Sequence, residues 1–228
     1  MFVSLGDLLD RGSQTIECLK FIESLDEDRK ILIRGNHEDL LEQCLKRKEF
    51  AQYDYGNGTV ATIMDLSEIY FRQSHDLSKI FDWAASNILY KNYMGSLKDY
   101  AEIANHIFVH GWIPCNVDDP TIYHSLNLHY EFNDNWREGD WARARWFNGM
   151  DAWNNGIKLE NKTIYCGHWH TSWGHHFLHN DGMEWENPRS TNPEHRRARF
   201  DPFVDTGIVA LDACAAHSRK VNCFVLEI

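Results

Sequence analysis

The sequence predicts an α/β fold with a mixed sheet, from a series of strand-like runs and a helix between the first two. Short apolar runs recur along the chain, and each ends in a polar cluster: FVSL before GD, ILI before RGNH, IFV before HGW and TIYC before GHWH. Such runs are typical of buried strands. Apolar residues repeat every three positions between the first two runs, at Ile16, Leu19, Ile22 and Leu25, which favours a helix packed on a sheet. The polar clusters are then expected at the carboxyl ends of strands, where open α/β sheets carry their sites.

The remaining segments predict the final strands of the sheet and the helices and loops that cover the site. GIVALDA and NCFVLEI are rich in β-formers and are expected to form a hairpin or edge pair at the end of the chain. Residues 39–104 hold helix-forming runs around the turn-like YGNGT, and residues 118–160, rich in Trp and Asn, are expected to be short helices and loops. We predict a single domain over residues 1–228, with 39–104 and 118–160 as its cap segments.

Composition and charge argue against two kinds of partner. The formal net charge is −11, with 23 Lys and Arg against 34 Asp and Glu. No nucleic-acid-binding face is expected, because binding a polyphosphate backbone needs a surplus of basic residues. No apolar stretch approaches the roughly 20 residues that cross a bilayer, so no membrane partner is expected. The six cysteines form no CxxC pair and the N-terminus has no signal-like segment, which predicts a reduced, cytoplasmic protein.

Acidic, amide and imidazole side chains gather at the predicted strand ends. Carboxylate and amide oxygens together with imidazole nitrogens are ligands that suit Mn²⁺, Fe²⁺ and Zn²⁺, and the absence of cysteine argues against a structural zinc site. GDLLDRG and GNHE are each a weak signal alone, whereas the ordered set predicts a metal-dependent site. The set comprises Asp7, Asp10, Arg11, Asn36, His37, His110, His168 and His170.

The order of these motifs resembles a known family. GDLLDRG, RGNHE, VHGW and GHWH are similar to the motif series of the calcineurin-like metallophosphoesterase superfamily. GDLLDRGSQTIECLKFI, IRGNHE, DWARAR and FVDTG are especially similar to bacterial and phage lambda-type serine/threonine protein phosphatases. The resemblance implies a four-layer α/β/β/α sandwich with mixed sheets and a hydrolase acting on phosphate esters. It also implies two divalent metal ions as cofactors, Mn²⁺ first, with Fe²⁺ or Zn²⁺ as alternatives.

Carried over position by position, the resemblance assigns the metal ligands. Asp7 resembles the aspartate that bridges the two metal ions. Asn36, His110 and His168 resemble the other protein ligands of one ion, and His170 resembles the histidine of GHxH motifs that reaches the other. The superfamily's earlier Asp-x-His motif, which supplies two more ligands from the first strand, does not occur in this sequence. We therefore expect the first strand of the fold to be missing and Met1 to lie inside a longer reading frame.

The same resemblance assigns the residues that act on the substrate. His37 matches the histidine that protonates the leaving-group oxygen, and Asp10 matches the carboxylate that orients it. Arg11 matches a phosphate-binding arginine, and Asn36 is expected to contact the substrate as well as a metal. In the implied mechanism a hydroxide activated by the two metal ions attacks phosphorus, without a covalent enzyme intermediate.

A second phosphate-binding arginine is expected in the DWARAR segment. The Trp-x-Arg pattern points to Arg143, with Arg145 as the alternative. A helix whose arginines pair with Glu138 and Asp140 is the competing interpretation. Beyond GHWH, the tract HHFLH at residues 175–179 is typical of a solvated loop, and we leave its histidines out of the site.

Three functional hypotheses follow from these residues. The leading one is hydrolysis of phosphomonoesters, with phosphoserine or phosphothreonine in proteins as the narrower form. The alternatives are a dinucleoside polyphosphate hydrolase, and a catalytically impaired remnant that binds phosphate or one metal. GHWHTS in place of the GHTP-like pattern of lambda-type enzymes points to broader phosphoesterases. The expected partner is a phosphorylated substrate, either a phosphoprotein or a small phosphoester; the sequence leaves the physiological substrate, the native metal and the oligomeric state open.

Overall fold

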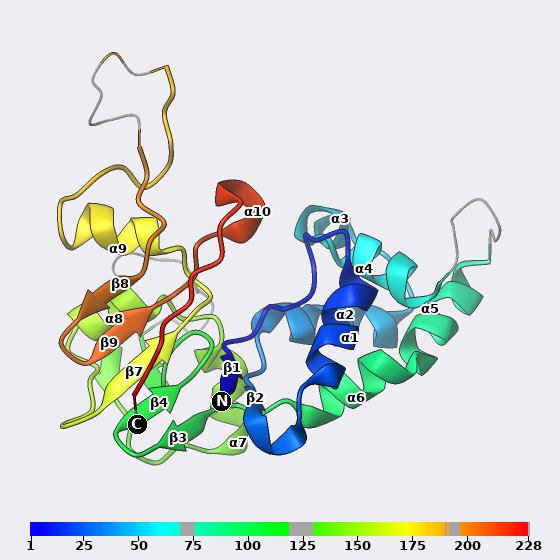
Figure 1. Cartoon of the computed structure of the whole chain (residues 1–228), viewed down its shortest axis with the longest axis horizontal. Coiled ribbons are helices and arrows are strands. Elements are labelled where there is room, and N and C mark those ends of the chain that lie inside the picture. Colours follow the sequence, from blue (N-terminus) through cyan, green and yellow to red (C-terminus); the bar gives the residue numbers. More distant parts are fainter. Residues whose placement is uncertain (69–75, 119–129, 190, 192–196, 228) are drawn as a thin grey trace. The chain divides into compact units, whose positions relative to one another are not determined.

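The computed structural model describes residues 1–68, 76–118, 130–189, 191 and 197–227 (Figure 1). The chain divides into two compact units, Met1–Lys98 and Asp99–Ile228, and each is described by itself. Both units contain strands and helices, and the larger sheet has parallel and antiparallel neighbours. The predicted α/β class with a mixed sheet is therefore confirmed.

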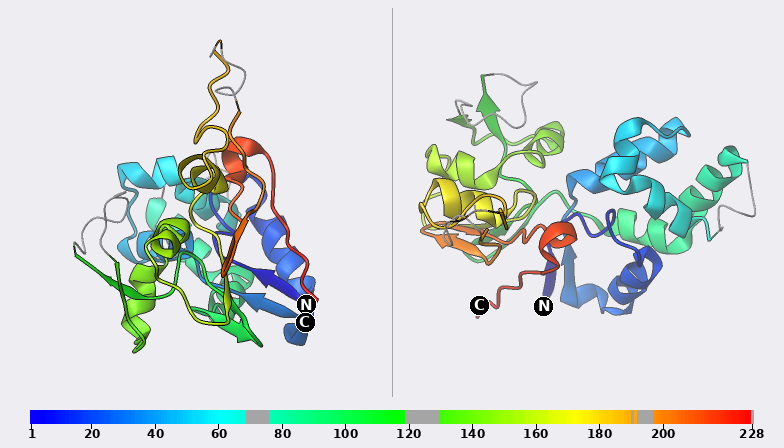
Figure 2. Two further views of the ribbon diagram at one scale, coloured as in Figure 1. Left: turned by 90° about the vertical axis from the view of Figure 1, so that its left-hand side faces the viewer. Right: turned by 90° about the horizontal axis from the view of Figure 1, so that it is seen from above.

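The first unit joins a pair of short parallel strands to a group of helices. Strand β1 pairs with β2 so that Phe2 lies opposite Lys30 and Ser4 opposite Leu32. Helix α1 packs against α6, and α4 packs against α1, α2 and α5 (Figures 1 and 2). The elements are β1 (Phe2–Ser4), α1 (Thr15–Ser24), η1 (Glu27–Arg29), β2 (Lys30–Leu32), α2 (Asn36–Arg47), α3 (Gln52–Asn57), α4 (Thr59–Leu66), α5 (Leu77–Ser86) and α6 (Ile88–Ser96).

The apolar pattern of the first unit explains these helices. In α1, Leu19 and Ile22 are buried in the core, as their spacing predicts, and Phe21 between them is exposed. Helix α3 ends and α4 begins within the turn-like YGNGT, and Gly58 between them has a φ of 87° that favours glycine. Asn87 begins α6 by accepting hydrogen bonds from the backbone N–H groups of Leu89 and Tyr90.

The second unit is built on a mixed sheet whose described strands run in the order β3-β4-β7-β9-β8. The inner pairs β4–β7 and β7–β9 are parallel, and the outer pairs are antiparallel. Helix α8 packs on β9, and α9 packs on β8 (Figure 2). The elements are β3 (Ala101–Ile103), β4 (His106–Phe108), β5 (Cys115–Val117), β6 (Tyr130–Phe132), α7 (Glu138–Ala144), α8 (Gly149–Asn154), β7 (Thr163–Cys166), α9 (Thr171–Phe177), β8 (Phe203–Asp205), β9 (Ile208–Ala210) and α10 (Ala215–Ser218).

The central strands of this sheet are buried on both faces. Ile164, Tyr165 and Cys166 of β7 are all buried, as are the three residues of β9. Continuous apolar runs are what a parallel strand covered on both faces requires, which is why TIYC and GIVALDA stand out in the sequence. Burial also raises the pKa of the Cys166 thiol, so this side chain acts as a small core hydrophobe.

The predicted pairing of GIVALDA with NCFVLEI is wrong. Strand β9 from GIVALDA pairs instead with β8, which precedes it by a tight turn in which Gly207 has a φ of 83°. The local hairpin occupies that edge of β9, and β7 occupies the other edge. The described residues of NCFVLEI contain no strand, and Phe224 and Val225 are exposed. Strand β8, which a short turn connects to β9, therefore pairs with β9 where the more distant NCFVLEI was expected.

The interpretation of HHFLH as a solvated loop is also wrong in part. Its first residues belong to α9, and His175 is buried at 3% exposure. The ring of His175 packs on Phe203 of β8, and its Nε2 lies 3.1 Å from the carbonyl oxygen of Asp201. Burial lowers the pKa of His175, so the ring is a neutral part of the core.

Candidate active site

Two loops of the first unit, which follow β1 and β2, bring candidate residues together. Because the two strands are parallel and in register, both loops leave the sheet at the same end. Asn36 and His37 are the first residues of α2, and both are buried. The backbone N–H of His37 donates to Asp7 Oδ1 at 3.0 Å. The predicted clustering of Asp7 with the GNHE segment is therefore present within this unit.

The loop after β1 has an unusual backbone. Asp7, Asp10 and Arg11 have φ values of 53°, 72° and 57°, in the left-handed region that favours glycine. A non-glycine residue in this backbone conformation destabilises the folded state by about 1–3 kcal/mol. The conformation persists where the surrounding structure stabilises it, often at functional sites. Gly35 allows the second loop to approach closely, since a Cβ there would lie 2.2 Å from Asp7 Oδ1. The two loops are thus fitted to one another through their backbones.

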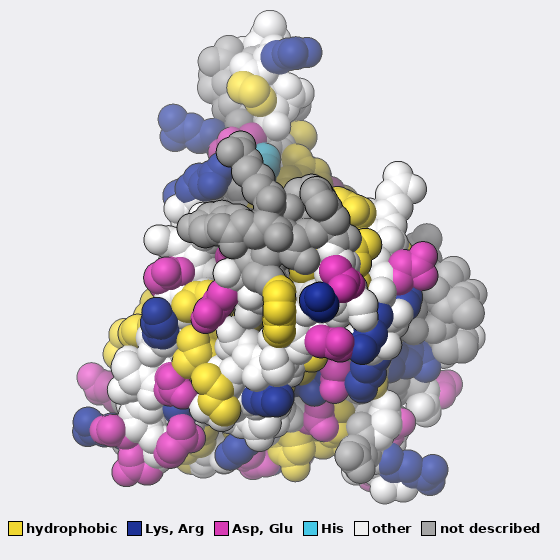
Figure 3. Space-filling view, turned by 90° about the vertical axis from the view of Figure 1, so that its right-hand side faces the viewer, with side chains coloured by type: hydrophobic (Ala, Val, Ile, Leu, Met, Phe, Trp, Pro, Cys, Tyr) yellow, Lys and Arg dark blue, Asp and Glu magenta, His cyan; other side chains and the backbone are white. Residues whose placement is uncertain are grey.

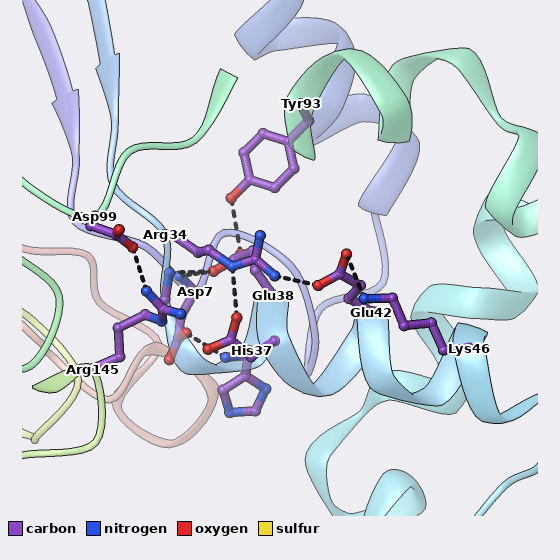
Figure 4. Close-up of polar contacts among 11 residues, drawn as sticks. Asp7, Arg34, His37, Glu38, Glu42, Lys46, Tyr93, Asp99 and Arg145 are labelled. Atoms are coloured by element: carbon purple, nitrogen blue, oxygen red, sulfur yellow. Dashed lines mark hydrogen bonds and ion pairs between the residues drawn. The ribbon is translucent and has the colours of Figure 1, made fainter. Parts of the chain in front are cut away.

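Glu38 links the two loops, and the sequence did not lead us to assign it. Its carboxylate is completely buried and accepts hydrogen bonds from the N–H groups of Asp7, Leu8 and Gly35 at 3.0, 3.1 and 2.8 Å. The hydroxyl of Tyr93, on α6, donates to it at 2.9 Å (Figure 4). A buried charge is tolerated only when it is hydrogen-bonded in this way. Glu38 therefore fixes the backbone that carries Asp7.

His37 and Asp10 form a buried pair. His37 Nδ1 lies 2.9 Å from Asp10 Oδ2, and the same carboxylate accepts hydrogen bonds from the hydroxyls of Thr59 and Thr62. Burial alone would lower the pKa of His37, but the hydrogen bond to Asp10 and the charge of Asp7 outweigh it, and the pKa is raised. A raised pKa favours the protonated ring, which is the form that a general acid requires.

Arg11 lies next to this pair and is exposed. Its positive charge opposes the rise in the pKa of His37, so the guanidinium is within electrostatic reach of the imidazole. An exposed cation beside a buried acid suits the binding of an anionic group at the surface of this unit.

In the second unit, His110 and His168 follow neighbouring parallel strands. The pairing of β4 with β7 continues beyond the strands, where the N–H of Gly167 donates to the carbonyl of His110 at 2.7 Å. The two imidazole rings are 5.2 Å apart between centroids and inclined by 57°, and a nitrogen of each lies within 4.8 Å of one of the other. His168 has a φ of 62°, again in the left-handed region. The two histidines predicted from VHGW and GHWH thus lie side by side.

His170 contacts Ser172, Glu184 and Trp185. The residue directly precedes α9 and its side chain is buried. Its Nδ1 is 2.8 Å from the hydroxyl of Ser172, and its Nε2 is 3.6 Å from Glu184 Oε1. Trp185 lies over the ring at 4.3 Å between centroids. Burial, aided by His217, lowers the pKa of His170 to about 4. The ring is therefore neutral, the form that binds metals, and its assignment as a ligand stays a prediction.

The two arginines of DWARAR have different surroundings. Arg145 is buried, and its Nη1 lies 2.6 Å from Asp99 Oδ1. Arg143, on α7, packs its guanidinium 5.8 Å from the centre of the Phe147 ring. Its Nε and Nη2 are buried and have no hydrogen-bond partner within the described part of the chain. Of the two, Arg143 has donors available for an anion.

The donor set of these residues fits divalent metal ions. Two nitrogens bound to one ion are at most about 4.2 Å apart, since metal–nitrogen distances are near 2.1 Å. A nitrogen of His110 lies within 4.8 Å of a nitrogen of His168. Asp7 and Asn36 supply the hard oxygen donors of the first unit. Nitrogen and oxygen donors without thiolates suit Mn²⁺, Fe²⁺ or Zn²⁺.

Comparison with known proteins gives one result. A family model described as calcineurin-like phosphoesterase matches residues 1–186, a segment that contains every candidate residue from Asp7 to His170. No curated protein and no solved structure matches the chain.

Proposed function

The chain belongs to the calcineurin-like phosphoesterase family, and on this premise we propose that it hydrolyses phosphomonoesters. Membership makes it a metal-dependent hydrolase acting on phosphate esters. The observation that carries the narrower proposal is the buried pair of His37 and Asp10, at 2.9 Å, beside the exposed Arg11. A phosphomonoester requires one proton for its leaving oxygen and cationic groups for its phosphoryl oxygens.

The proton comes from His37 in this proposal. With Asp10 ionised, Nδ1 of His37 donates to Asp10, which leaves Nε2 to carry the proton that is transferred. The raised pKa of His37 keeps the ring protonated over a wider range of pH than an ordinary histidine. Asp10 does not touch the substrate and acts as a positioning residue.

The metal ligands in this proposal are Asp7, Asn36, His110, His168 and His170. When bound, two divalent ions would lower the pKa of a water molecule and neutralise charge on the phosphoryl oxygens. The family is dimetal-dependent, and the side chains present suit Mn²⁺, with Fe²⁺ and Zn²⁺ as the other candidates.

Arg11 and Arg143 are the proposed phosphate-binding arginines, and Asn36 is a further substrate contact. The exposure of Arg11 and the unpartnered donors of Arg143 in the described residues support these roles. Arg145 was the alternative candidate for this second arginine. Its ion pair with Asp99 favours a structural role for Arg145 and therefore supports Arg143.

The proposed substrate class rests on the motifs. The likeness of GDLLDRG and RGNHE to lambda-type protein phosphatases supports phosphoserine and phosphothreonine in proteins. The net charge of −11 argues against nucleic acid, and acidic and basic side chains are mixed on the face drawn in Figure 3. A cytoplasmic location is proposed because Cys44, Cys115 and Cys166 are buried thiols; none of the described helices is long and apolar enough to span a membrane.

The test is the rate of hydrolysis of a chromogenic phosphomonoester with and without Mn²⁺. We expect turnover that needs Mn²⁺, is abolished in Asp7→Asn and falls by about 10²- to 10⁴-fold in His37→Asn, the range typical of a general acid. A phosphoserine peptide and a dinucleoside polyphosphate, assayed side by side, distinguish the substrate classes. Hydrolysis no faster than that of Asp7→Asn, in a chain shown to be folded, would contradict the proposal and favour a catalytically impaired protein.

A further inference from the structure

Two buried threonine hydroxyls meet the carboxylate of Asp10 from the start of α4. Thr59 Oγ1 donates to Asp10 Oδ2 at 2.7 Å, and Thr62 Oγ1 donates to Asp10 Oδ1 at 2.7 Å. The N–H of Asp10 donates back to Thr62 Oγ1 at 3.2 Å. Both oxygens of the carboxylate and the backbone of the same residue are therefore tied to one helix end.

Water cannot replace these contacts without a rearrangement. Thr59 and Thr62 have exposures of 0% and 1%, and the Asp10 side chain is 1% exposed. Thr62 Oγ1 has a longer alternative acceptor in the carbonyl of Gly58 at 3.4 Å, but its single proton is better used at 2.7 Å. A buried carboxylate that lost a donor here would be left short of a hydrogen bond, which costs about 1–3 kcal/mol.

The backbone around α4 is fitted to the same turn. A Cβ at Gly58 would lie 2.3 Å from the backbone nitrogen of Arg11. Gly58, which directly precedes Thr59, is therefore in close contact with the Asp10–Arg11 turn. That turn has left-handed φ values at two non-glycine residues, a conformation that needs support from its surroundings. The start of α4 supplies this support through a close backbone approach and two hydroxyls.

Asp10 Oδ2 is shared between Thr59 and His37, at 2.7 and 2.9 Å. We propose that Thr59 and Thr62 are positioning residues for His37: they hold the Asp10 carboxylate where it accepts a hydrogen bond from His37 Nδ1 and so direct Nε2 toward the substrate. This inference rests on the proposed function. Neither threonine contacts the reacting atoms, because their hydroxyls are used by Asp10.

The kinetic test replaces the hydroxyls without changing side-chain shape. Thr59→Val and Thr62→Val keep the branched form and lose the donor, whereas Thr59→Ser and Thr62→Ser keep the donor. We expect each Val variant to lower kcat about tenfold for phenyl phosphate with little change in KM. The loss should be smaller for an activated aryl phosphate that needs no proton on leaving, and the Ser variants should recover wild-type kcat within about threefold.

The decisive control places the same substitutions in a His37→Asn background. A positioning role predicts that Thr59→Val then has no further effect on kcat, because the residue it positions is gone. Thr15→Val, a buried threonine at the start of α1, is the matched control and should leave kcat unchanged within about twofold. Equal losses in both backgrounds, or wild-type kcat in the Thr59→Val/Thr62→Val double variant, would overturn the inference.

A second readout does not depend on turnover. In metal-free protein, at a pH high enough to keep the ring neutral, nitrogen NMR reports which nitrogen of His37 carries the proton. We expect protonated, hydrogen-bonded Nδ1 in the wild type and in the Ser variants, and loss of that signature in the Thr59→Val/Thr62→Val variant. An unchanged His37 spectrum in the double variant refutes the positioning role. If the wild type hydrolyses no phosphoester, the proposed function fails, while this spectrum still decides whether the threonines set the state of His37.

Discussion

At the scale of single residues, two buried carboxylates of the first unit do different work. Glu38 accepts three backbone N–H groups and a tyrosine hydroxyl, and so holds the chain. Asp10 accepts two hydroxyls and an imidazole, and so holds a side chain. We therefore expect Glu38 to contribute mainly to stability and Asp10 mainly to function. Substitutions at the two positions should distinguish these effects.

We predict that Glu38→Ala lowers the free energy of unfolding by roughly 3–5 kcal/mol. It leaves the N–H groups of Asp7, Leu8 and Gly35 and the hydroxyl of Tyr93 without this completely buried acceptor. Tyr93→Phe removes one of these bonds and should cost about 1–2 kcal/mol. Urea unfolding measures both values. A loss below about 1 kcal/mol for Glu38→Ala would show that the loop finds other acceptors.

A matched pair of glycines tests the fit between the two loops. Gly35→Ala places a Cβ 2.2 Å from Asp7 Oδ1, so we expect a loss of about 1–3 kcal/mol in stability and a loss of phosphoesterase activity. Gly95→Ala, in α6, meets nothing within 4 Å and should be neutral or stabilise by up to about 1 kcal/mol. Thermal unfolding and kcat are measured for both. Similar behaviour of the two variants contradicts the close approach at Gly35.

The sequence could predict only some of these residues. Asp7, Asp10 and His37 belong to motifs whose order along the chain is readable, and the structure brings them together. Glu38 lies in the same GNHE motif, but its role depends on Tyr93, which is 55 residues away. Thr59 and Thr62 meet Asp10 from 49 and 52 residues away. Spacing and composition carry no information on such distant hydrogen-bond partners.

At the scale of elements, burial explains which predictions succeeded. The runs FVSL and TIYC contain β1 and β7, and the runs ILI and IFV overlap β2 and β4, because short apolar runs are typical of buried strands. The predicted pairing at the end of the chain was wrong because Phe203–Asp205 is only three residues long, ends in a polar residue and gives a weak strand signal. Its proximity to β9 through a two-residue turn outweighed the stronger β pattern of NCFVLEI.

The contact between α8 and β6 gives a prediction about pH. Asp151 of α8 accepts a hydrogen bond from the Tyr130 hydroxyl at 3.1 Å. Burial raises the pKa of Asp151 from 3.8 to about 6, although the hydrogen bonds from Tyr130 and Asn155 oppose the rise. The folded protein therefore holds this proton more tightly than the unfolded chain. The resulting stabilisation is complete below pH 3.8 and is lost as the pH rises through about 6.

Asp151→Asn should remove this dependence. Relative to wild type, the variant is expected to gain up to roughly 2–3 kcal/mol of stability as the pH rises from about 3.8 to above 6, at about 1.4 kcal/mol for each pKa unit. Urea unfolding of both proteins at the two ends of this range measures the difference. Asp28→Asn, at an exposed position of η1, is the control and should show no such change. A constant difference between Asp151→Asn and wild type at all pH values would contradict the burial effect.

At the scale of the whole molecule, the negative net charge and the binding of metal cations both affect the stability of the folded state. Asp and Glu exceed Lys and Arg by 34 to 23, and an excess of negative charge destabilises a folded chain through self-repulsion. Divalent cations that bind the folded state offset this repulsion and also stabilise it by mass action. The family's dependence on two metal ions should therefore be visible in stability, whatever the substrate.

We predict that Mn²⁺ raises the melting temperature of the wild-type protein in the absence of any substrate. At a concentration of one hundred times the dissociation constant, binding to the folded state contributes about 2.7 kcal/mol, or a shift of roughly 5–10 °C for a chain of this size. Asp7→Asn and His168→Asn each lose a proposed ligand and should show a much smaller shift, whereas His179→Asn, which lies outside the proposed ligand set, should keep it. The measurement is thermal unfolding with Mn²⁺ and again after a chelator, which should reverse the shift. Equal stabilisation of all four proteins would mean that Mn²⁺ acts by screening the acidic surface, and the proposed ligands would then be wrong.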